Sequence, residues 1–190
     1  MPPFLDVLEL IGSVPLGAVE VNAGGRIAAM NRLAAEILEN GEVLRNRDGY
    51  LEFAERYDSQ SIERMIQTAV AHSGRRVTVT LRRPSTGTMV SIAVNGPSDR
   101  AQATIFVSDP TLIPPPPDGS LRLLYGFSGY EARLARVLIA GKTLAEAAVE
   151  LGITTETART YLKAIFRKVG VKRQCELLVH LLTSPAYTLK

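Results

Sequence analysis

Residues 143–171 read TLAEAAVELGITTETARTYLKAIFRKVGV, and this stretch decides the fold of the C-terminal part of the chain. Thr143 and Glu146 form a capping box, in which a hydroxyl and a carboxylate satisfy backbone N–H groups at the start of a helix. Gly152 can adopt the positive φ that a sharp turn requires, and Thr154 can cap the helix that follows. The stretch therefore predicts two helices joined by a sharp turn.

The helix that Thr154 caps is expected to run to about Val169 and to have two different faces. Its apolar side chains recur at the spacing of a buried stripe, at Ala158, Leu162, Ile165 and Val169. The opposite face is polar and mostly basic, with Glu156, Arg159, Thr160, Lys163 and Arg167. A helix fits the major groove of DNA, where long basic side chains reach base edges and phosphates. The pattern therefore favours a DNA-reading helix over a solvated one.

The rest of the C-terminal part also reads as helical. Ser128 and Glu131 form a second capping box, and a last helix is expected from about Arg173 to Leu182. This gives four helices in all. The last helix carries four leucines, Leu177, Leu178, Leu181 and Leu182. Either all four pack inside this small unit, or part of that apolar surface serves self-association.

A proline-rich stretch divides the chain. Residues 110–120 read PTLIPPPPDGS, and consecutive prolines favour an extended, semi-rigid spacer. We therefore expect a domain over 1–109, a linker over 110–120 and a DNA-binding domain over 121–190. The charge distribution supports this division, because residues 118–190 carry 11 basic and 6 acidic residues, whereas the preceding part carries 11 and 13. A local basic surplus points to a phosphate-rich partner.

Composition limits the class of protein. Hydrophobic residues make up 46% of the chain, which suffices for globular cores, and no apolar run approaches the ~20 residues that span a bilayer. The start lacks the basic region of a signal peptide. The single cysteine, Cys175, excludes an internal disulfide and fits a reducing compartment. We expect a cytoplasmic protein without membrane partners.

Residues 1–109 predict a mixed domain. Short strands are expected at 17–22 and 26–31, and a helix at 32–39 with Asn31 as its cap and Gly41 beyond its end. After a less regular middle come a helix over 59–73 and three strands rich in β-branched residues, at 76–81, 89–94 and 103–107. Short turns between these strands favour antiparallel neighbours.

Residues 127–180 resemble the LuxR-type helix-turn-helix domain. The family's motifs appear in register as FSGYE at 127–131, GKT at 141–143, EAA at 146–148, LGIT at 151–154, TAR at 157–159 and KVGV at 168–171. The resemblance covers about a third of the chain. Two positions depart from the family pattern, because Ala158 replaces the usual Val and Tyr161 the usual His. We expect Tyr161 to pack against the core.

The resemblance implies roles for individual side chains. Arg159, Thr160 and Lys163 would read bases. Thr157, Arg167 and Lys168 would bind phosphates, and Thr155 and Glu156 complete the expected interface. The last helix would form the dimer contact, through Leu177, Leu178 and Leu181.

The order of elements in residues 1–109 resembles a PAS domain, with GRIAAMNRLAAEIL at 25–38 as the most characteristic piece. The fold class is therefore α+β, with a PAS-like antiparallel sheet and flanking helices before an all-α domain. Such a domain would bind a small molecule or dimerise. We expect no cofactor, because Cys175 lies outside this domain and its one histidine, His72, is more typical of a surface or core residue. The arginines at 75, 76, 82 and 83 favour a solvated cluster over an anion site.

These observations support a dimeric regulator that binds double-stranded DNA in a manner set by its N-terminal domain, with RNA polymerase as a further partner. A second hypothesis is a protein-interaction module that docks onto another regulator or polymerase, which would favour apolar residues on the outer helix face. An enzyme is not expected, because the sequence has no Walker loop, no nucleophile elbow and no metal-spaced His/Cys set.

Overall fold

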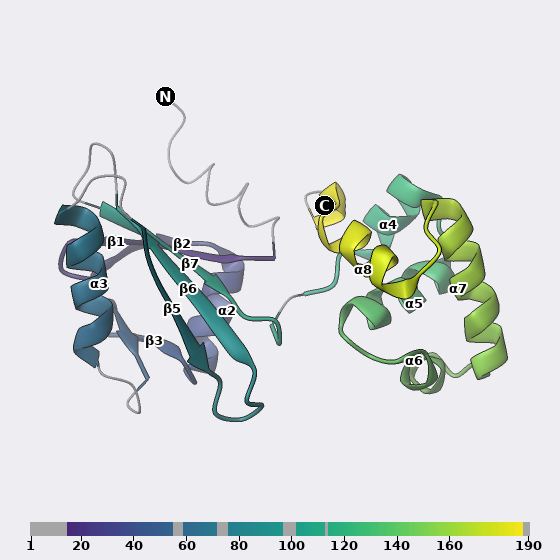
Figure 1. The fold of residues 1–190 in the computed structure, drawn as a ribbon, viewed down its shortest axis with the longest axis horizontal. Helices are drawn as coiled ribbons and strands as arrows, with labels where there is room; N and C mark the ends of the chain where they lie inside the picture. Colours follow the sequence, from purple (N-terminus) through teal and green to yellow (C-terminus); the bar gives the residue numbers. More distant parts are fainter. Residues whose placement is uncertain (1–14, 55–58, 72–75, 97–101, 113, 188–190) are drawn as a thin grey trace. The chain divides into compact units, whose positions relative to one another are not determined.

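The computed structural model describes residues 15–54, 59–71, 76–96, 102–112 and 114–187 (Figure 1). The chain divides into two compact units, Met1–Ile113 and Pro114–Lys190. The first unit is mixed α and β, and the second is helical, so the expected α+β class is confirmed. No helix among the described residues is both long enough and apolar enough to cross a membrane.

The N-terminal unit is built on a five-stranded antiparallel sheet of order β2-β1-β7-β6-β5. Its strands are β1 Gly17–Asn22, β2 Ile27–Met30, β5 Arg76–Arg82, β6 Met89–Asn95 and β7 Gln102–Ser108. The unit also contains α2 Arg32–Asn40, α3 Ser59–Ala71 and a separate hairpin of β3 Leu44–Arg47 and β4 Tyr50–Phe53. This is the order of elements on which the PAS resemblance rests.

Asn31 links the start of α2 to the sheet. Its side-chain oxygen accepts hydrogen bonds from the backbone N–H of Ala34 at 2.9 Å and of Ala18 at 3.0 Å. The helix ends at Gly41, as expected. One buried asparagine therefore satisfies both a helix terminus and the first strand.

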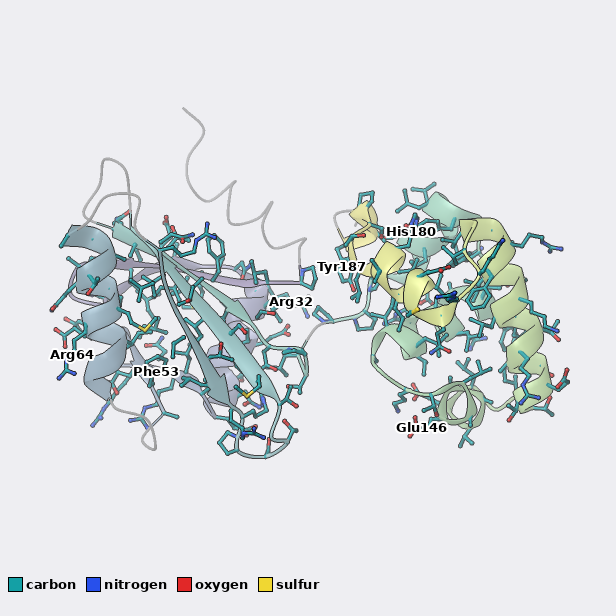
Figure 2. The ribbon with its side chains drawn as sticks, in the orientation of Figure 1. Arg32, Phe53, Arg64, Glu146, His180 and Tyr187 are labelled. Atoms are coloured by element: carbon teal, nitrogen blue, oxygen red, sulfur yellow. The ribbon has the colours of Figure 1, made fainter. Side chains whose placement is uncertain are left out.

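The sheet has one buried and one open face. On β5, β6 and β7 the residues that alternate toward the helices, such as Val90, Ile92 and Ile105, are buried in one core with α2 and α3. Phe53 of β4 lies in the same core and is 1% exposed (Figure 2). The residues between them, such as Thr78 and Ser91, are exposed on the other face.

The β3–β4 hairpin lies where the sequence indicated a less regular segment. Asp48 and Gly49 both adopt positive φ, 52° and 86°, at the turn. That conformation is typical of the two-residue hairpin turns that Asp-Gly favours. The strands are only four residues long, too short for their alternation to give a clear sequence signal.

Arg83 corrects the expectation of a solvated arginine cluster. Its side chain is 5% exposed and is paired with Asp109, which is 1% exposed, and with Glu42 at 2.7 Å. Asn40 accepts a further hydrogen bond from the same guanidinium at 2.9 Å. Burial of a charge requires such partners. Arg76 and Arg82 are exposed as expected, and Arg75 and His72 lie outside the described residues.

The C-terminal unit contains α4 Asp118–Tyr125, α5 Gly129–Ile139, α6 Leu144–Glu150, α7 Thr155–Val169, α8 Gln174–Leu182 and the short 3-10 helix η1 Pro185–Tyr187. The expectation of four helices was therefore incomplete, because α4 begins inside the expected linker. Asp118 lies in the first turn of α4, where a negative charge interacts favourably with the helix dipole. Its carboxylate also accepts a hydrogen bond from Arg136 at 2.9 Å. Leu121 of α4 is fully buried in the core of the unit.

Candidate nucleic-acid interface

The α6–turn–α7 segment has the local geometry that its sequence predicts. Thr143 and Glu146 form the expected capping box, and Thr154 accepts a hydrogen bond from the backbone N–H of Thr157 at 3.1 Å. Gly152 adopts a φ of 64°, in the left-handed region that glycine tolerates without steric cost. The stop of α6 and the start of α7 are therefore fixed by these side chains and by one glycine.

Small side chains bring α6 and α7 close together. Ala148 is 2% exposed and Ala158 is 0% exposed. Leu162 and Ile165 continue the buried stripe of α7, and Val169 is half-buried at its end. The inner face of α7 is thus occupied by the core, which leaves its opposite face to solvent.

The outer face of α7 exposes three basic side chains. Lys163 and Arg167 are exposed, and neither makes an ion pair within the described part of the chain. Arg159 is 61% exposed and lies 3.2 Å from the carboxylate of Glu156, which is 77% exposed. An exposed pair of this kind contributes little to stability and can exchange partners readily.

The polar residues of the same helix are placed differently. Thr155 and Thr160 are exposed, and the Thr160 hydroxyl donates to the carbonyl of Glu156 at 3.1 Å. Thr157 is half-buried, and its hydroxyl lies 2.8 Å from that of Thr154. Thr157 therefore belongs to the capped first turn, beside the exposed face rather than at its centre.

Lys168, an expected phosphate ligand, makes an ion pair within the unit. Its ammonium group lies 2.6 Å from the carboxylate of Glu131 and 2.7 Å from the carbonyl oxygen of Gly126. Glu131 is a buried residue whose carboxylate also accepts from the backbone N–H of Ser128 at 2.6 Å. These two bonds hold the end of α7 against α5 and the residue that precedes α5 by three positions, a contact that the sequence did not indicate.

Three leucines were expected to form a dimer contact, but two of them are buried in the core of the unit. Leu177 and Leu181 are both 0% exposed and lie in the core of the unit, whereas Leu178 is half-buried. The exposed side of α8 instead carries Val179, which is 63% exposed, and Cys175. The alternative in which α8 packs inside the unit is therefore correct for Leu177 and Leu181.

In the described part of the C-terminal unit, the charged side chains with neither an ionic partner nor a role in a helix cap are all basic. Its acidic residues are all engaged, with basic partners or with the caps of helices: Asp118, Glu131, Glu146, Glu150, Glu156 and Glu176. Five cations make no ion pair within residues 114–187: Arg122, Arg133, Lys163, Arg167 and Lys172. The free charge of the unit is therefore positive, which suits an anionic polymer.

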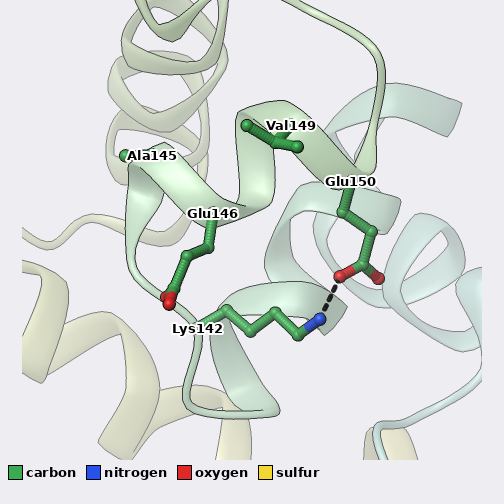
Figure 3. A pocket seen from close by; sticks show the side chains of 5 residues that line it. All are labelled: Lys142, Ala145, Glu146, Val149 and Glu150. Carbon is green, nitrogen blue, oxygen red and sulfur yellow. Dashed lines mark hydrogen bonds and ion pairs between the residues drawn. The ribbon is translucent and has the colours of Figure 1, made fainter.

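A shallow hollow of about 530 Å³ lies on the exposed side of α6 (Figure 3). Ala145 and Val149 form its apolar part, and Val149 is 82% exposed. Lys142 and Glu150 close one side with an ion pair of 2.5 Å between Nζ and Oε2. Because its polar groups are already paired, the hollow offers no convergent set of free groups for chemistry.

A second hollow, of about 480 Å³, lies on the open face of the N-terminal sheet. It is lined by Thr78 and Thr80 of β5, Ser91 of β6 and Phe106 of β7, with Arg76 at one end. The lining is uncharged apart from Arg76, whose guanidinium donates to Asn95 at 2.9 Å. Within the described residues no group of His, Cys, Asp or Glu has the arrangement of a metal site.

Comparisons with known proteins found one family model and several similar solved structures. Residues 127–181 match the family model of bacterial regulatory proteins, luxR family. No curated protein sequence matches the chain. Among solved structures, the chain is similar to the phage VqmA–DPO complex, with 19% identity over 98% of this chain and 89% of that chain and a TM-score of 0.40.

A second similar structure is the Vibrio cholera VqmA–ligand–DNA complex, with 15% identity over 100% of this chain and 91% of that chain and a TM-score of 0.38. The family model spans α5 to α8, the same helices that carry the capping boxes, the Gly152 turn and the exposed face of α7. Residues 127–181 are therefore a LuxR-family helix-turn-helix domain.

Proposed function

We propose that this chain is a transcriptional regulator that binds double-stranded DNA sequence-specifically, as a homodimer, with α7 in the major groove. The observation that carries the proposal is the outer face of α7, where Arg159, Lys163 and Arg167 are exposed beside an apolar inner face. The major groove of B-DNA is about 12 Å wide and admits one helix with its side chains. The proposal requires no cofactor and no catalytic group.

The side chains at the start and middle of α7 are the proposed base readers. Arg159 and Lys163 can donate to O6 and N7 of guanine, and Thr160 can contact either donors or acceptors. Glu156 can orient Arg159 across their 3.2 Å contact or accept from the amino group of cytosine. The proposed phosphate ligands are Thr155 and Thr157 in the first turn of α7 and Arg167 in its last turn.

The alternative of a protein-docking helix is less well supported. A docking helix presents large apolar side chains to its partner. The exposed residues of α7 are instead charged or are threonines. An outer surface of this composition gains little from contact with an apolar groove, whereas it suits the charged edge of a duplex.

The proposed dimer contact lies on the exposed side of α8. Val179 projects from that side, and Leu178 and Leu182 flank it as half-buried residues. A second copy of the same face would cover this apolar surface in a two-fold arrangement. Self-association through α8 would also present two α7 helices to two half-sites.

The N-terminal unit is proposed to modulate DNA binding. Asp109 directly precedes the proline-rich stretch, and Arg83 holds it at the end of β7. A small molecule that shifts the sheet would therefore act on the first residues of the linker. Contact with RNA polymerase and a cytoplasmic location follow from the proposed role in transcription.

Selection from a random duplex library tests the proposal. The purified full chain should enrich a consensus of two related half-sites, with centres about 34–36 Å apart or a multiple of that distance. Lys163→Gln should change the preferred base at one position in each half-site, whereas Lys172→Gln, a matched exposed cation outside α7, should not. Failure to enrich any sequence would contradict sequence-specific binding.

A further inference from the structure

We propose that Arg133 of α5 binds a DNA phosphate, and that Tyr130 and Tyr161 position it for that contact. This inference rests on the proposed function and extends the interface from α7 onto α5. Arg133 belongs to none of the sequence signals for DNA binding, because it lies on a different helix, α5, well before the turn at Gly152. The side-chain geometry alone identifies it.

The three side chains form one stack. The rings of Tyr130 and Tyr161 lie 5.6 Å apart between centroids, with an interplanar angle of 12°. The guanidinium carbon of Arg133 lies 4.3 Å from the centroid of the Tyr130 ring. Such distances are typical of aromatic stacking and of a cation–π contact. The stack therefore connects α7 to a cation on α5.

The charge of Arg133 has no acidic partner in the described part of the chain. Arg133 is exposed and makes no ion pair among the described residues, whereas Arg136, on the same helix, is paired with Asp118 at 2.9 Å. Its ring partner Tyr130 is 43% exposed. A guanidinium that stacks by its face keeps its N–H edges free, and those edges match the oxygens of a phosphate.

The position of Tyr161 places the stack beside the proposed DNA surface. At 100° per residue, Tyr161 lies on the flank of α7 between the buried stripe of Leu162 and the outer face of Thr160. A helix with its side chains is about 10–12 Å wide, close to the width of the major groove. DNA phosphates therefore run along both flanks of a groove-bound helix. Arg133 lies on the flank that carries Tyr161, to which the stack connects it.

The stack also explains why Tyr161 is only half-buried. Tyr161 packs against the core of the unit, as expected from the sequence, and its ring also stacks on Tyr130 at the surface. Packing against the Tyr130 ring, which itself stacks on Tyr161, restricts the rotamers of Arg133 before DNA arrives. A pre-ordered side chain loses less conformational entropy on binding than a free one.

Salt dependence of DNA affinity tests this inference with the full-length protein. Arg133→Gln should weaken binding to a mixed-sequence duplex and reduce the slope of log K against log salt by about one, the loss of one phosphate contact. The base preference should stay unchanged. Arg122→Gln on α4 is the matched control, because Arg122 is also exposed but, among the described residues, makes neither an ion pair nor a cation–π contact. Equal slopes for Arg133→Gln and the wild type would overturn the inference.

Two variants of Tyr130 separate the stack from the charge. Tyr130→Phe retains the ring and should bind as the wild type does, whereas Tyr130→Leu should lose part of the affinity although Arg133 is still present. Equal affinity for these two variants would overturn the positioning role. Arg167→Gln distinguishes the proposals. If it lowers the slope and Arg133→Gln does not, only this inference fails. If the wild type does not bind DNA, the proposed function fails with it.

Discussion

The ammonium group of Lys168 lies 2.6 Å from the carboxylate of Glu131, so the last turn of α7 is joined to the first turn of α5. The same carboxylate completes the capping box of α5 through the backbone N–H of Ser128. The carbonyl of Gly126, between α4 and α5, accepts a further bond from Lys168 at 2.7 Å. This lysine thus helps to hold α7 against the rest of the unit, together with the buried stripe of that helix.

Lys168→Met should destabilise the C-terminal unit without removing a phosphate contact. The variant leaves the buried carboxylate of Glu131 without its cation, which costs up to about 3–5 kcal/mol in fully buried pairs. Because the Lys168 side chain is 30% exposed, we expect a smaller loss, on the order of 2 kcal/mol. Urea unfolding of the full chain measures it. A stable variant whose salt slope falls by about one would instead make Lys168 a phosphate ligand.

The stability of the C-terminal unit should fall in acid because of Glu131. Burial by itself raises the pKa of this carboxyl, but hydrogen bonds from Lys168 and Ser128 outweigh burial and hold the pKa below its ordinary value. Since the folded pKa is depressed, the stabilisation is complete above the unfolded value of about 4.3 and is lost as the pH falls through the folded pKa.

Glu131→Gln measures that contribution directly. The variant should be less stable than the wild type at neutral pH, and the difference should shrink as the pH falls below about 4. Thermal unfolding across this pH range provides the measurement. A difference that stays constant with pH would show that the charge of Glu131 does not stabilise the unit.

Asp109→Ala should destabilise the N-terminal unit. Asp109 and Arg83 are both buried, and removal of the carboxylate leaves the guanidinium with Glu42 as its acidic partner. We expect a loss of about 3 kcal/mol, the lower end for a broken buried pair. The unfolding transition of this unit in urea measures the loss. Arg82→Gln, a change at an exposed neighbour, serves as the control and should alter stability by less than about 0.5 kcal/mol.

Val179→Glu should weaken self-association while leaving the unit folded. Val179 is 63% exposed, so a charge there costs little in the monomer but is unfavourable in an apolar contact between two copies. Sedimentation at several concentrations should show a shift toward the monomer. Leu177→Ala should act differently, because that side chain is fully buried and its loss costs about 2–5 kcal/mol of stability. An unchanged dimer in the Val179 variant would place the contact elsewhere.

The helix boundaries of the C-terminal unit could be predicted because their signals are local. Ser128 with Glu131 and Thr143 with Glu146 form capping boxes within one turn, and Gly152 marks the turn by itself. The strands β5, β6 and β7 were predicted for a similar reason, since each alternates over seven residues. Signals that lie within a few residues survive without knowledge of the tertiary structure.

The features that were missed depend on partners far away in the sequence. Arg83 meets Asp109 across 26 residues, and Lys168 meets Glu131 across 37, so neither pairing has a local pattern. The helix α4 was missed because prolines precede it directly, although proline at a helix start is favourable. The Asp48-Gly49 turn was a usable signal for the β3–β4 hairpin.

The proposed interface is predictable only in part. The outer residues of α7 follow from helical periodicity, so Lys163 and Arg167 could be named before the structure. Whether a cation is free or paired depends on its neighbours, and in this respect Lys168 and Arg133 differ. The first is bonded to Glu131, and the second makes no ion pair in the described residues.

The most direct measurement of the central claim is the salt dependence of duplex binding by the wild type and by the double variant Lys163→Gln/Arg167→Gln. The account predicts that the wild type binds at low salt, that log K falls linearly with log salt, and that the double variant binds more weakly with a slope reduced by one to about two. Wild-type protein that fails to bind duplex DNA at low salt, or a double variant with unchanged affinity and slope, would contradict it.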